Sequence, residues 1–268
     1  MAHDKSRVLL FKKFHGAGND FILINGMENR ISLSTEEIAA LCHRRTGIGA
    51  DGMILIRPAE DADYRMHYYN SDGREASMCG NGGRCAAAFA YNCELAGTEQ
   101  RFIGPDGTHL AKILGVEQES YRVQLELREV SELVKGPGYY LLDTGSPHYV
   151  SFGHNLNTMD IVSQARKIRF SSQFAPEGLN INFAEEKNGK LFVRTYERGV
   201  EEETLSCGTG VTAAALAYAE KMQLTQGVVS ILTRGGDLQV SFIKEEGHYR
   251  KIQLIGPAIQ VFEGSITR

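Results

Sequence analysis

The sequence predicts an α+β protein made of two pseudo-symmetric units, each a curved, mostly antiparallel sheet around one central helix. A Cys-Gly-x-Gly segment followed by an alanine-rich apolar run occurs twice, as "MCGNGGRCAAAFAY" at 78–91 and "SCGTGVTAAALAYA" at 206–219. An offset of 128 residues aligns the two segments without a gap. The same offset matches Tyr68 with Tyr196, Glu75 with Glu203, and Cys79 with Cys207. A duplicated unit explains this order.

Each repeat is expected to contain a strand, a polar loop and a helix that begins at the Cys-Gly pair. The two strands are predicted at 64–70 and 191–197. Both cysteine-led helices are apolar nearly all round, which predicts that each is buried inside a curled sheet. Two further helices are expected. One, at 34–45, opens with a capping box from Ser34 to Glu37, and the other, at 158–169, is amphipathic.

Short runs rich in β-branched and aromatic residues predict the remaining strands. These runs are 8–14, 20–26, 53–57, 121–130, 139–143, 179–183, 228–233, 238–243 and 259–266. A charged stretch with Gly-Pro at 128–138 breaks the strand pattern. We therefore expect a first unit over 1–128, completed by a C-terminal strand at 257–268, and a second unit over 129–256. Cys79 belongs to the first unit and Cys207 to the second.

The composition is that of an ordinary globular protein, with 42% hydrophobic and 23% charged residues in 268. A net charge of −4 and a pI near 6.1 argue against a nucleic-acid partner or a polybasic membrane partner. The first residues contain an apolar run of only four, too short for a signal peptide, and no 18-residue apolar span follows. These features predict a cytoplasmic protein without a membrane partner.

The cysteine and histidine patterns predict neither disulfides nor a metal site. Five cysteines are an odd number, and neither a CxxC pair nor an HxxxH pair occurs. Cys42, Cys85 and Cys93 are expected inside helices as packing residues. For Cys79 and Cys207 the repeated position at a helix start favours a function over packing.

A cysteine at a helix start has a specific chemical use. The first-turn N–H groups are unpaired donors at the positive end of the helix dipole, so a thiol there is expected to ionise below its usual pKa of about 8.5. The backbone amides of four residues could hold a carboxylate, namely Gly80, Asn81, Gly208 and Thr209. If the duplication brings both helix starts to one cleft, one thiolate removes a proton from a carbon while the opposite thiol delivers one. That inverts a stereocentre without a cofactor.

Six segments stand in one order along nearly the whole chain. They are "FHGAGNDF" (14–21), "RRTGIGADG" (44–52), "YNSDGREASMCGNGGRC" (69–85), "TGSPH" (144–148), "GLNINF" (178–183) and "TYERGVEEETLSCGTG" (195–210). In sequence and order they closely resemble the motifs of the diaminopimelate epimerase family. The resemblance implies an isomerase that interconverts LL- and meso-2,6-diaminopimelate, in lysine and peptidoglycan-precursor synthesis, without pyridoxal phosphate or a metal.

The resemblance also implies roles for individual residues. Cys79 and Cys207 match the base and acid pair, and His148 and Glu197 match residues that tune the thiols. The positions that match substrate contacts are Asn19, Asn70, Asn180, Arg198, and the helix starts Gly80-Asn81 and Gly208-Thr209. Glu197 is counted with the substrate contacts as well. A small-molecule partner is implied, and a homodimer is compatible with the sequence, which does not give the oligomeric state.

Each of these residues also has a purely structural interpretation. Asn19 and Asn70 lie in turn-like stretches, and Asn180 lies in a strand where its amide could bond a neighbouring backbone group. Arg198 could be a solvated charge and Glu197 an exposed carboxylate at a strand end. His148 follows Pro147 in what is predicted to be a loop.

The chain departs from the family pattern in two places. The loop before Cys207 is one residue longer than the commoner form and carries Glu201–Glu203, which predicts an exposed loop. Ser146 stands where many members have Asn, so no substrate contact is assigned to it. The alternative functions are a two-cysteine proline or hydroxyproline racemase, a phenazine-type isomerase, a thiol redox protein and a non-catalytic binding module.

Overall fold

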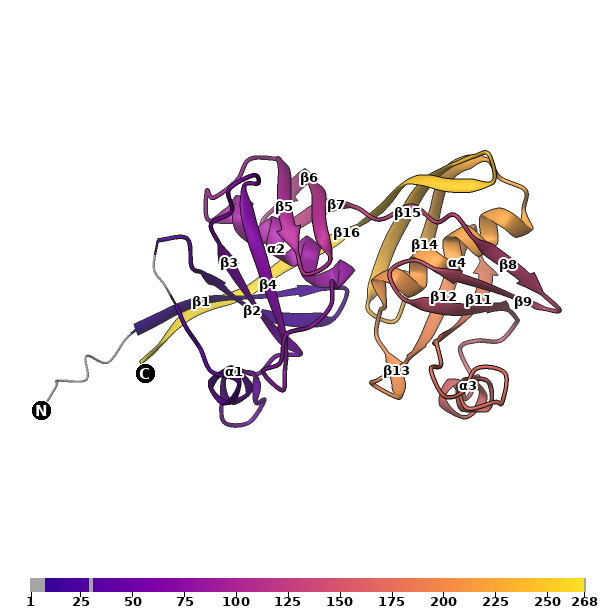
Figure 1. The fold of residues 1–268 in the computed structure, drawn as a ribbon, viewed down its shortest axis with the longest axis horizontal. Helices are drawn as coiled ribbons and strands as arrows, with labels where there is room; N and C mark the ends of the chain where they lie inside the picture. The colour runs from indigo at the N-terminus through magenta and orange to yellow at the C-terminus, as the bar shows by residue number, and fades with distance from the viewer. Residues whose placement is uncertain (1–7, 29–30, 268) are drawn as a thin grey trace, which may run out of the picture. The chain divides into compact units, whose positions relative to one another are not determined.

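The computed structural model describes residues 8–28 and 31–267, which form two compact units (Figure 1). The first unit takes in the described residues up to Met78, then Gly82–Val123 and the chain end from Ala258. The second unit is Gln124–Pro257 together with Cys79–Asn81. The division after Val123 falls a few residues before the stretch expected to separate the units, and the three residues around Gly80 group with the second unit.

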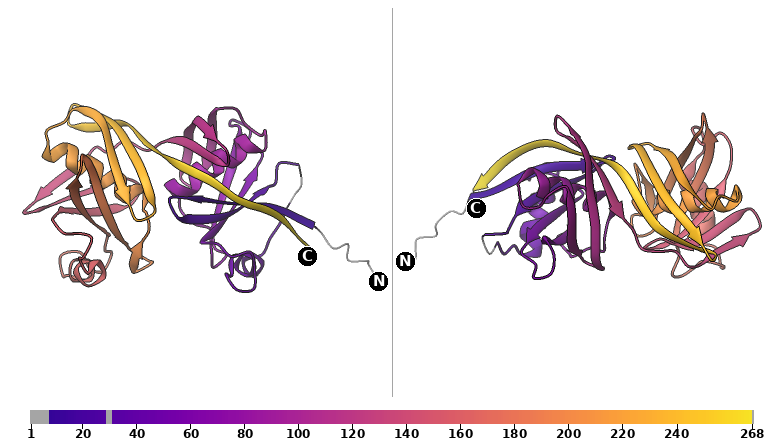
Figure 2. Two further views of the ribbon diagram at one scale, coloured as in Figure 1. Left: turned by 180° about the vertical axis from the view of Figure 1, so that it is seen from behind. Right: turned by 90° about the horizontal axis from the view of Figure 1, so that it is seen from above.

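The first unit is a closed barrel of eight strands. Its strand order is β1-β2-β3-β4-β5-β6-β7-β16, and β1 also pairs with β16, antiparallel, to close the ring. Figure 2 shows the end of β16 running beside β1. The strands are β1 (Val8–Gly16), β2 (Asn19–Asn25), β3 (Gly52–Arg57), β4 (Tyr64–Asn70), β5 (Glu99–Gly104), β6 (Gly107–Glu117), β7 (Ser120–Glu126) and β16 (His248–Thr267). The helices are α1 (Thr35–Cys42) and α2 (Gly80–Asn92).

The second unit has the strand order β16-β15-β14-β12-β11-β10-β9-β8, with β13 added on β12. The Leu127 N–H donates to the Ile252 carbonyl (2.9 Å), and a bridge joins Val130 to Tyr249, so the segment before β8 reaches back to β16. The strands are β8 (Leu133–Gly136), β9 (Tyr139–Asp143), β10 (Pro147–Phe152), β11 (Asn180–Lys187), β12 (Lys190–Glu197), β13 (Glu202–Thr204), β14 (Gln226–Thr233) and β15 (Gly236–Glu245). The helices are α3 (Ile161–Arg169) and α4 (Gly208–Lys221).

The two units repeat one topology. Both contain, in this order, two strands, a helix, two strands, the cysteine-led helix and three further strands, and the second unit adds β8 before this series and β13 before α4. The pairings also alternate identically: β1–β2 is antiparallel, β2–β3 parallel and β3–β4 antiparallel, as are β9–β10, β10–β11 and β11–β12. The hairpin of "HGAGNDF" in the first unit therefore corresponds to the hairpin of "TGSPH" in the second, a match that the sequence alignment did not provide.

Both cysteine-led helices are buried, as their composition predicts. Residues 80–90 of α2 are all buried, and α4 buries ten residues between Gly208 and Ala219 while it contacts six strands of its unit. Alanines on these helices leave room for the surrounding strands. The predicted capping box of α1 is present, because Ser34 Oγ accepts from the Glu37 N–H and the Glu37 side chain accepts from the Ser34 N–H.

Two predictions about local structure were wrong, and a third was correct only in part. His148 lies in strand β10 rather than in a loop, because Pro147 occupies the first position of the strand, where a missing N–H is tolerated. Cys93 lies in the turn after α2. The loop with Glu201–Glu203 is exposed at Val200 and Glu202, as predicted, but it also contains the short strand β13, in which Glu203 pairs with Tyr196 of β12 and its carboxylate binds a buried arginine.

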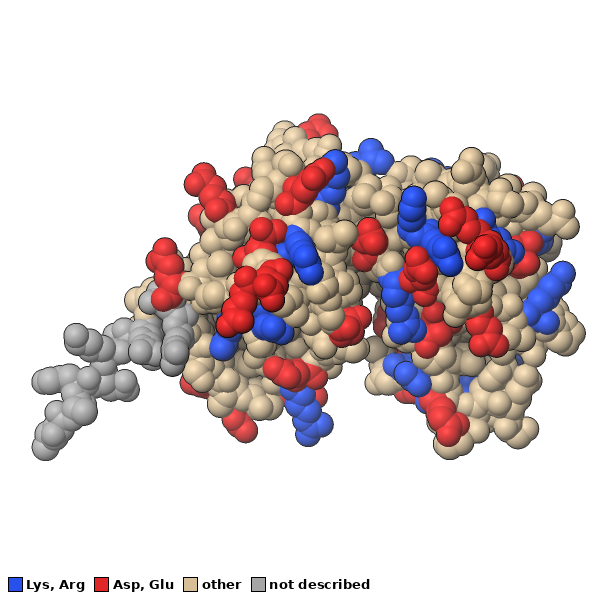
Figure 3. All heavy atoms as spheres, turned by 45° about the horizontal axis from the view of Figure 1, so that its top comes forward, with Lys and Arg blue, Asp and Glu red and all other residues tan. Residues whose placement is uncertain are grey.

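Two predictions, on membrane-spanning helices and on charged surface patches, can be compared with the described residues. No helix in residues 8–28 and 31–267 is long and apolar enough to cross a membrane. Acidic and basic side chains are interspersed on the face seen in Figure 3. The N-terminal residues 1–7, on which the signal-peptide prediction partly depends, lie outside the described residues.

Candidate active site

Cys207 lies immediately before α4, as the N-cap residue, in extended conformation (φ −112°, ψ 114°). Its side chain makes no capping hydrogen bond, so its sulfur is available to other partners. Cys207 Sγ lies 3.4 Å from Thr209 Oγ1, and the residue is only 8% exposed. The helix start therefore presents a buried thiol beside a hydroxyl group.

The start of α2 lies against the start of α4 within the second unit. A Cβ placed on Gly208 would lie 3.2 Å from Gly80 Cα, and one placed on Gly80 would lie 2.9 Å from Leu254 Cδ2 and 3.5 Å from Gly208 Cα, so the two glycines let the helix starts approach closely. Asn81 is buried, and its Nδ2 donates to the Ser206 carbonyl (3.1 Å). Cys79 is the residue directly before Gly80, and Cys207 is the residue directly after Ser206.

The pKa of Cys207 contradicts the prediction of an acidic thiol. Burial raises the pKa of Cys207 well above its ordinary value, and the nearby Glu197 carboxylate raises it further. The Thr209 hydroxyl and the Gly210 N–H lower the pKa, but they do not outweigh these effects. The desolvation of the thiol therefore outweighs the helix-start donors, and Cys207 rests as a neutral thiol.

His148 is fixed in the second unit by a network of neutral groups. It is 1% exposed, with Nδ1 3.1 Å from Asn182 Nδ2 and Nε2 3.1 Å from Ser146 Oγ. Burial lowers the pKa of His148 to about 3, with Asp143 raising it and Arg198 lowering it to smaller extents. The imidazole is therefore uncharged at neutral pH.

Ser146 joins His148 to the start of α4. Ser146 Oγ accepts from Asn180 Nδ2 (3.0 Å) and lies 3.3 Å from Thr209 Oγ1. Thr144 Oγ1 donates to the Thr209 carbonyl (2.8 Å), which ties the β9–β10 turn to the helix. The Asn180 side chain accepts from the Arg198 N–H (2.8 Å), so it does bond a neighbouring backbone group as well.

Glu197 and the longer loop next to it are held to the second unit. Glu197 is half-buried at the end of β12 and accepts a hydrogen bond from Thr204 Oγ1. In the loop, Glu203 forms a two-point ion pair with buried Arg194 (Nε–Oε1 and Nη2–Oε2, both 2.6 Å). Glu203 therefore anchors a loop that is otherwise exposed at Val200 and Glu202.

In the first unit, Asn19 belongs to a charged cluster. Asn19 Nδ2 donates to Asp51 Oδ2 (2.7 Å), and Arg44 bridges Asp51 and Asp20 (Nη2–Oδ1, 2.6 and 2.7 Å). Asn70 is exposed at the end of β4, where it pairs with Gly52, the residue after Asp51. Asn19 and Asn70 thus lie at one end of the same sheet.

Arg198 is exposed, and its guanidinium is held by main-chain carbonyls. Its Nη1 donates to Glu177 (3.2 Å) and Gly178 (3.3 Å) in the loop before β11. Two backbone acceptors leave the planar guanidinium with further N–H donors, which suits recognition of a carboxylate.

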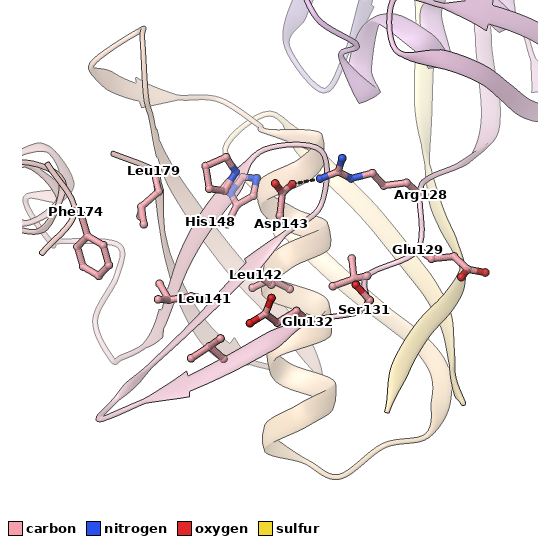
Figure 4. A pocket seen from close by; sticks show the side chains of 13 residues that line it. Arg128, Glu129, Ser131, Glu132, Leu141, Leu142, Asp143, His148, Phe174 and Leu179 are labelled. Carbon is pink, nitrogen blue, oxygen red and sulfur yellow. Dashed lines mark hydrogen bonds and ion pairs between the residues drawn. The ribbon is translucent and has the colours of Figure 1, made fainter. Parts of the chain in front are cut away.

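A cavity of about 610 Å³ in the second unit reaches His148 from the side of β9 (Figure 4). Its lining is mainly apolar, with Leu141, Leu179 and Phe174, and the volume falls in the range of small-molecule sites. Figure 4 shows the Arg128 guanidinium directed at Asp143, the carboxylate that also acts on His148.

The sequence did not point to several residues of this network. Asn182, Thr195 and Thr144 were not selected, and Ser146 was set aside. Asn180 and Asn182 are two residues apart in a strand, which places both side chains on one face, so the "NIN" spacing was a signal for Asn182. Among residues 8–28 and 31–267, no group of three His, Cys, Asp or Glu side chains could hold a metal ion.

A family model described as Diaminopimelate epimerase matches residues 11–126 and again residues 140–261, one match in each unit. The diaminopimelate epimerase of Flavobacterium psychrophilum is 44% identical over 259 residues, covering 95% of this chain and 98% of that protein. The enzyme of the same name from Chlorobaculum tepidum is 40% identical over 261 residues, covering 94% and 99%.

Solved structures with low sequence identity share the fold. A phenazine biosynthesis protein from Bacillus anthracis has a TM-score of 0.73 at 14% identity, covering 97% of this chain and 99% of that one. A hydroxyproline epimerase from Agrobacterium vitis has a TM-score of 0.67 at 14% identity, covering 97% and 93%. At this identity the likeness shows the α+β fold alone.

Proposed function

Because the chain belongs to the diaminopimelate epimerase family, we propose that it interconverts LL- and meso-2,6-diaminopimelate by two-base proton transfer. The observation that carries the proposal is the approach of Gly80 and Gly208, each directly preceded by a cysteine. Two thiols at adjoining helix starts supply a proton acceptor and a proton donor for one carbon.

The reacting carboxylate is bound by the helix starts. The backbone N–H groups at Gly80-Asn81 and Gly208-Thr209 donate to it, and they stabilise the negative charge that spreads from the α-carbon as the proton leaves. Cys79 and Cys207 act as base and acid, exchanging roles with the direction of reaction. No cofactor is required for these steps, since the protein supplies both proton carriers.

His148 and Glu197 tune the thiols. Glu197 acts on Cys207 through its negative charge, which favours the protonated thiol and so suits a general acid. His148 is neutral and hydrogen-bonded in the same unit. Each proton transfer is easier when the pKa values of donor and acceptor are close. Substrate binding, Glu197 and His148 together set the pKa values of the two thiols and so the direction of proton transfer.

The distal amino-acid end of the substrate is read by a separate group of residues. Arg198, with Asn180 bonded to its backbone, is the proposed partner of the distal carboxylate, and Asn19 and Asn70 provide amide contacts from the first unit. A proline or hydroxyproline racemase needs no such set, because those substrates have no second amino-acid end.

The test is turnover of LL-diaminopimelate compared with L-lysine and L-proline by the purified protein. We expect meso-diaminopimelate to form while lysine and proline stay unchanged, because lysine lacks the distal carboxylate. Arg198→Ala should reduce turnover of diaminopimelate mainly through a higher KM. Comparable turnover of proline or lysine by the unmodified protein would instead favour the broader racemase function.

We further propose that the protein works in the cytoplasm, where lysine and peptidoglycan precursors are made, and assembles as a homodimer. Cell fractionation tests the first statement. Light scattering during size-exclusion chromatography tests the second, and a monomer mass at micromolar concentration would contradict it.

A further inference from the structure

A continuous series of polar side chains in the second unit ends at Cys207. From Asn182 Nδ2 it passes to His148 Nδ1 (3.1 Å), from His148 Nε2 to Ser146 Oγ (3.1 Å), and on to Thr209 Oγ1 (3.3 Å). Thr209 Oγ1 lies 3.4 Å from Cys207 Sγ. The direction in which these groups donate decides what the series does to the thiol.

The Asn182 amide fixes the tautomer of His148. Asn182 Nδ2 lies 2.9 Å from the Tyr149 carbonyl, which can only accept, and Asn182 Oδ1 accepts from Thr195 Oγ1 (2.9 Å). The amide nitrogen therefore also faces His148 Nδ1, so Nδ1 must be the unprotonated acceptor. The proton of the neutral ring is then on Nε2, and it is donated to Ser146.

A second amide fills the other lone pair of the serine oxygen. Asn180 Oδ1 accepts from the Arg198 N–H, which orients its Nδ2 toward Ser146 Oγ. With two donors on its oxygen, Ser146 has only its own O–H left to offer, and Thr209 Oγ1 is the acceptor within reach. The Thr209 hydroxyl then has its own proton free to donate to the sulfur.

We propose that Ser146 is a positioning residue that orients the Thr209 hydroxyl toward Cys207 and so stabilises the Cys207 thiolate. A thiolate has only lone pairs, and a hydrogen bond to a charged acceptor is stronger than one to a neutral group. The proposal rests on the proposed function, in which Cys207 is one of the reacting thiols.

Other groups facing the series act in known directions. Glu197 at the end of β12 and Cys79 raise the pKa of Cys207, while the Gly210 N–H of α4 lowers it. At the other end, Asp143 of β9 raises and Arg198 lowers the pKa of His148, which burial keeps near 3. The imidazole of His148 thus stays neutral near neutral pH, so the series of hydrogen bonds keeps the same donor-to-acceptor direction.

The experiment measures Cys207 alone, in the full chain without substrate. Iodoacetamide alkylation of Cys207 is followed by peptide mass spectrometry from pH 6 to 11, and because only the thiolate reacts, the rate at each pH compares the thiolate fraction of Cys207 between variants. Ser146→Ala should slow alkylation at pH 8 roughly three- to tenfold and shift the profile to higher pH. Thr209→Val, which removes the last donor, should slow it roughly tenfold or more.

Two further variants separate positioning from a general structural effect. Ser146→Thr keeps the hydroxyl and should restore the unmodified profile. Ser151→Ala, on the same strand β10 but outside the series, should leave it unchanged. If Ser146→Ala does not fold, Thr209→Val carries the same test.

A Cys207 profile that coincides in Ser146→Ala, Thr209→Val and the unmodified protein would overturn the proposal. This readout needs no turnover, so it distinguishes the proposal from the proposed function. Absence of diaminopimelate epimerisation by the unmodified protein contradicts the function, whereas an unchanged alkylation profile contradicts only the role of Ser146.

Discussion

Asp20 and His148 stand 128 residues apart near the starts of equivalent strands, β2 and β10, yet their surroundings differ completely. Asp20 binds Lys13 Nζ (2.7 Å) and both terminal nitrogens of Arg44 (3.0 and 2.7 Å). These cations hold the pKa of Asp20 well below its usual range although burial opposes them. His148 instead contacts an amide and a hydroxyl group and is neutral.

The comparison shows how a duplicated fold acquires two different halves. The first unit uses a charged cluster whose strength depends on complementary partners, and the cluster orients the Asn19 amide. The second unit uses neutral donors and acceptors whose direction matters, and these lead to Cys207. One topology therefore supports ionic positioning on one side and hydrogen-bond tuning on the other.

The largest effect is expected where the units are most alike, at the cysteine preceding each buried helix. Cys79→Ala and Cys207→Ala should each lower kcat for diaminopimelate by at least about 10³-fold, because inversion needs both a donor and an acceptor. Initial rates in both directions measure this. Cys93→Ala, in the turn after α2, is the control and should keep near-normal turnover.

Retention of substantial turnover by either helix-start variant would contradict the two-base account. Loss in Cys79→Ala alone would show that the units are functionally unequal despite their common topology.

A smaller effect is expected for the charged cluster. Asp20→Asn leaves Lys13, which is 7% exposed, without its carboxylate and should lower the free energy of unfolding by roughly 2–3 kcal/mol. Urea unfolding measures the change. Asp237→Asn removes the exposed pair with Lys190 and should cost less than about 1 kcal/mol. Equal losses in the two variants would show that the cluster contributes no more than a surface ion pair.

The two units should also differ in acid. The unfolded chain protonates His148 below its ordinary pKa of 6.5, whereas burial keeps the folded pKa near 3. The unfolded state therefore binds more protons in this window, so stability from His148 is complete above pH 6.5 and is lost as pH falls toward 3. Asp20 has a lowered folded pKa, so its contribution is lost only as pH falls below about 3.8.

His148→Gln tests that difference. Between pH 7 and pH 4.5 its free energy of unfolding should drop by about 2 kcal/mol less than that of the unmodified protein. His248→Gln, at an exposed position of β16, is the matched control and should keep the unmodified drop. Equal drops in both variants and the unmodified protein would argue against a buried neutral imidazole.

Much of the fold could be predicted because short stretches of neighbouring residues determine the elements concerned. The capping box at Ser34 and the apolar alanine-rich helices needed only neighbouring residues. Strand β10 was missed because Ser-Pro before His148 is typical of a turn, and the parallel pairing of β10 with β11 joins segments separated by α3. A C-terminal strand at 257–268 was expected to complete the first unit, but its antiparallel pairing with β1 joins the two ends of the chain, and no local pattern indicates that partner.

The sequence predicted which residues belong to the candidate site better than it predicted their contacts and pKa values. Cys207 and His148 were selected, but the contact of Ser146 with Thr209 spans 63 residues and depends on how the β9–β10 turn meets α4. The expected acidity of Cys207 was wrong because helix-start donors were weighed without the desolvation that burial imposes. Burial is a property of the assembled unit, so the sign of this pKa shift could not be read from the motif.

Solvent-hydrogen exchange at the α-carbon of diaminopimelate tests the central claim most directly. In deuterium oxide, with LL-diaminopimelate as substrate, the account predicts that the first meso product formed carries one deuterium at the inverted carbon, because the incoming proton comes from the opposite thiol. The LL-diaminopimelate recovered early should remain unlabelled, because the thiol that abstracts its proton holds that proton and returns the same one on reversal. Meso product formed without deuterium would contradict the two-thiol account and indicate a single base that returns the same proton.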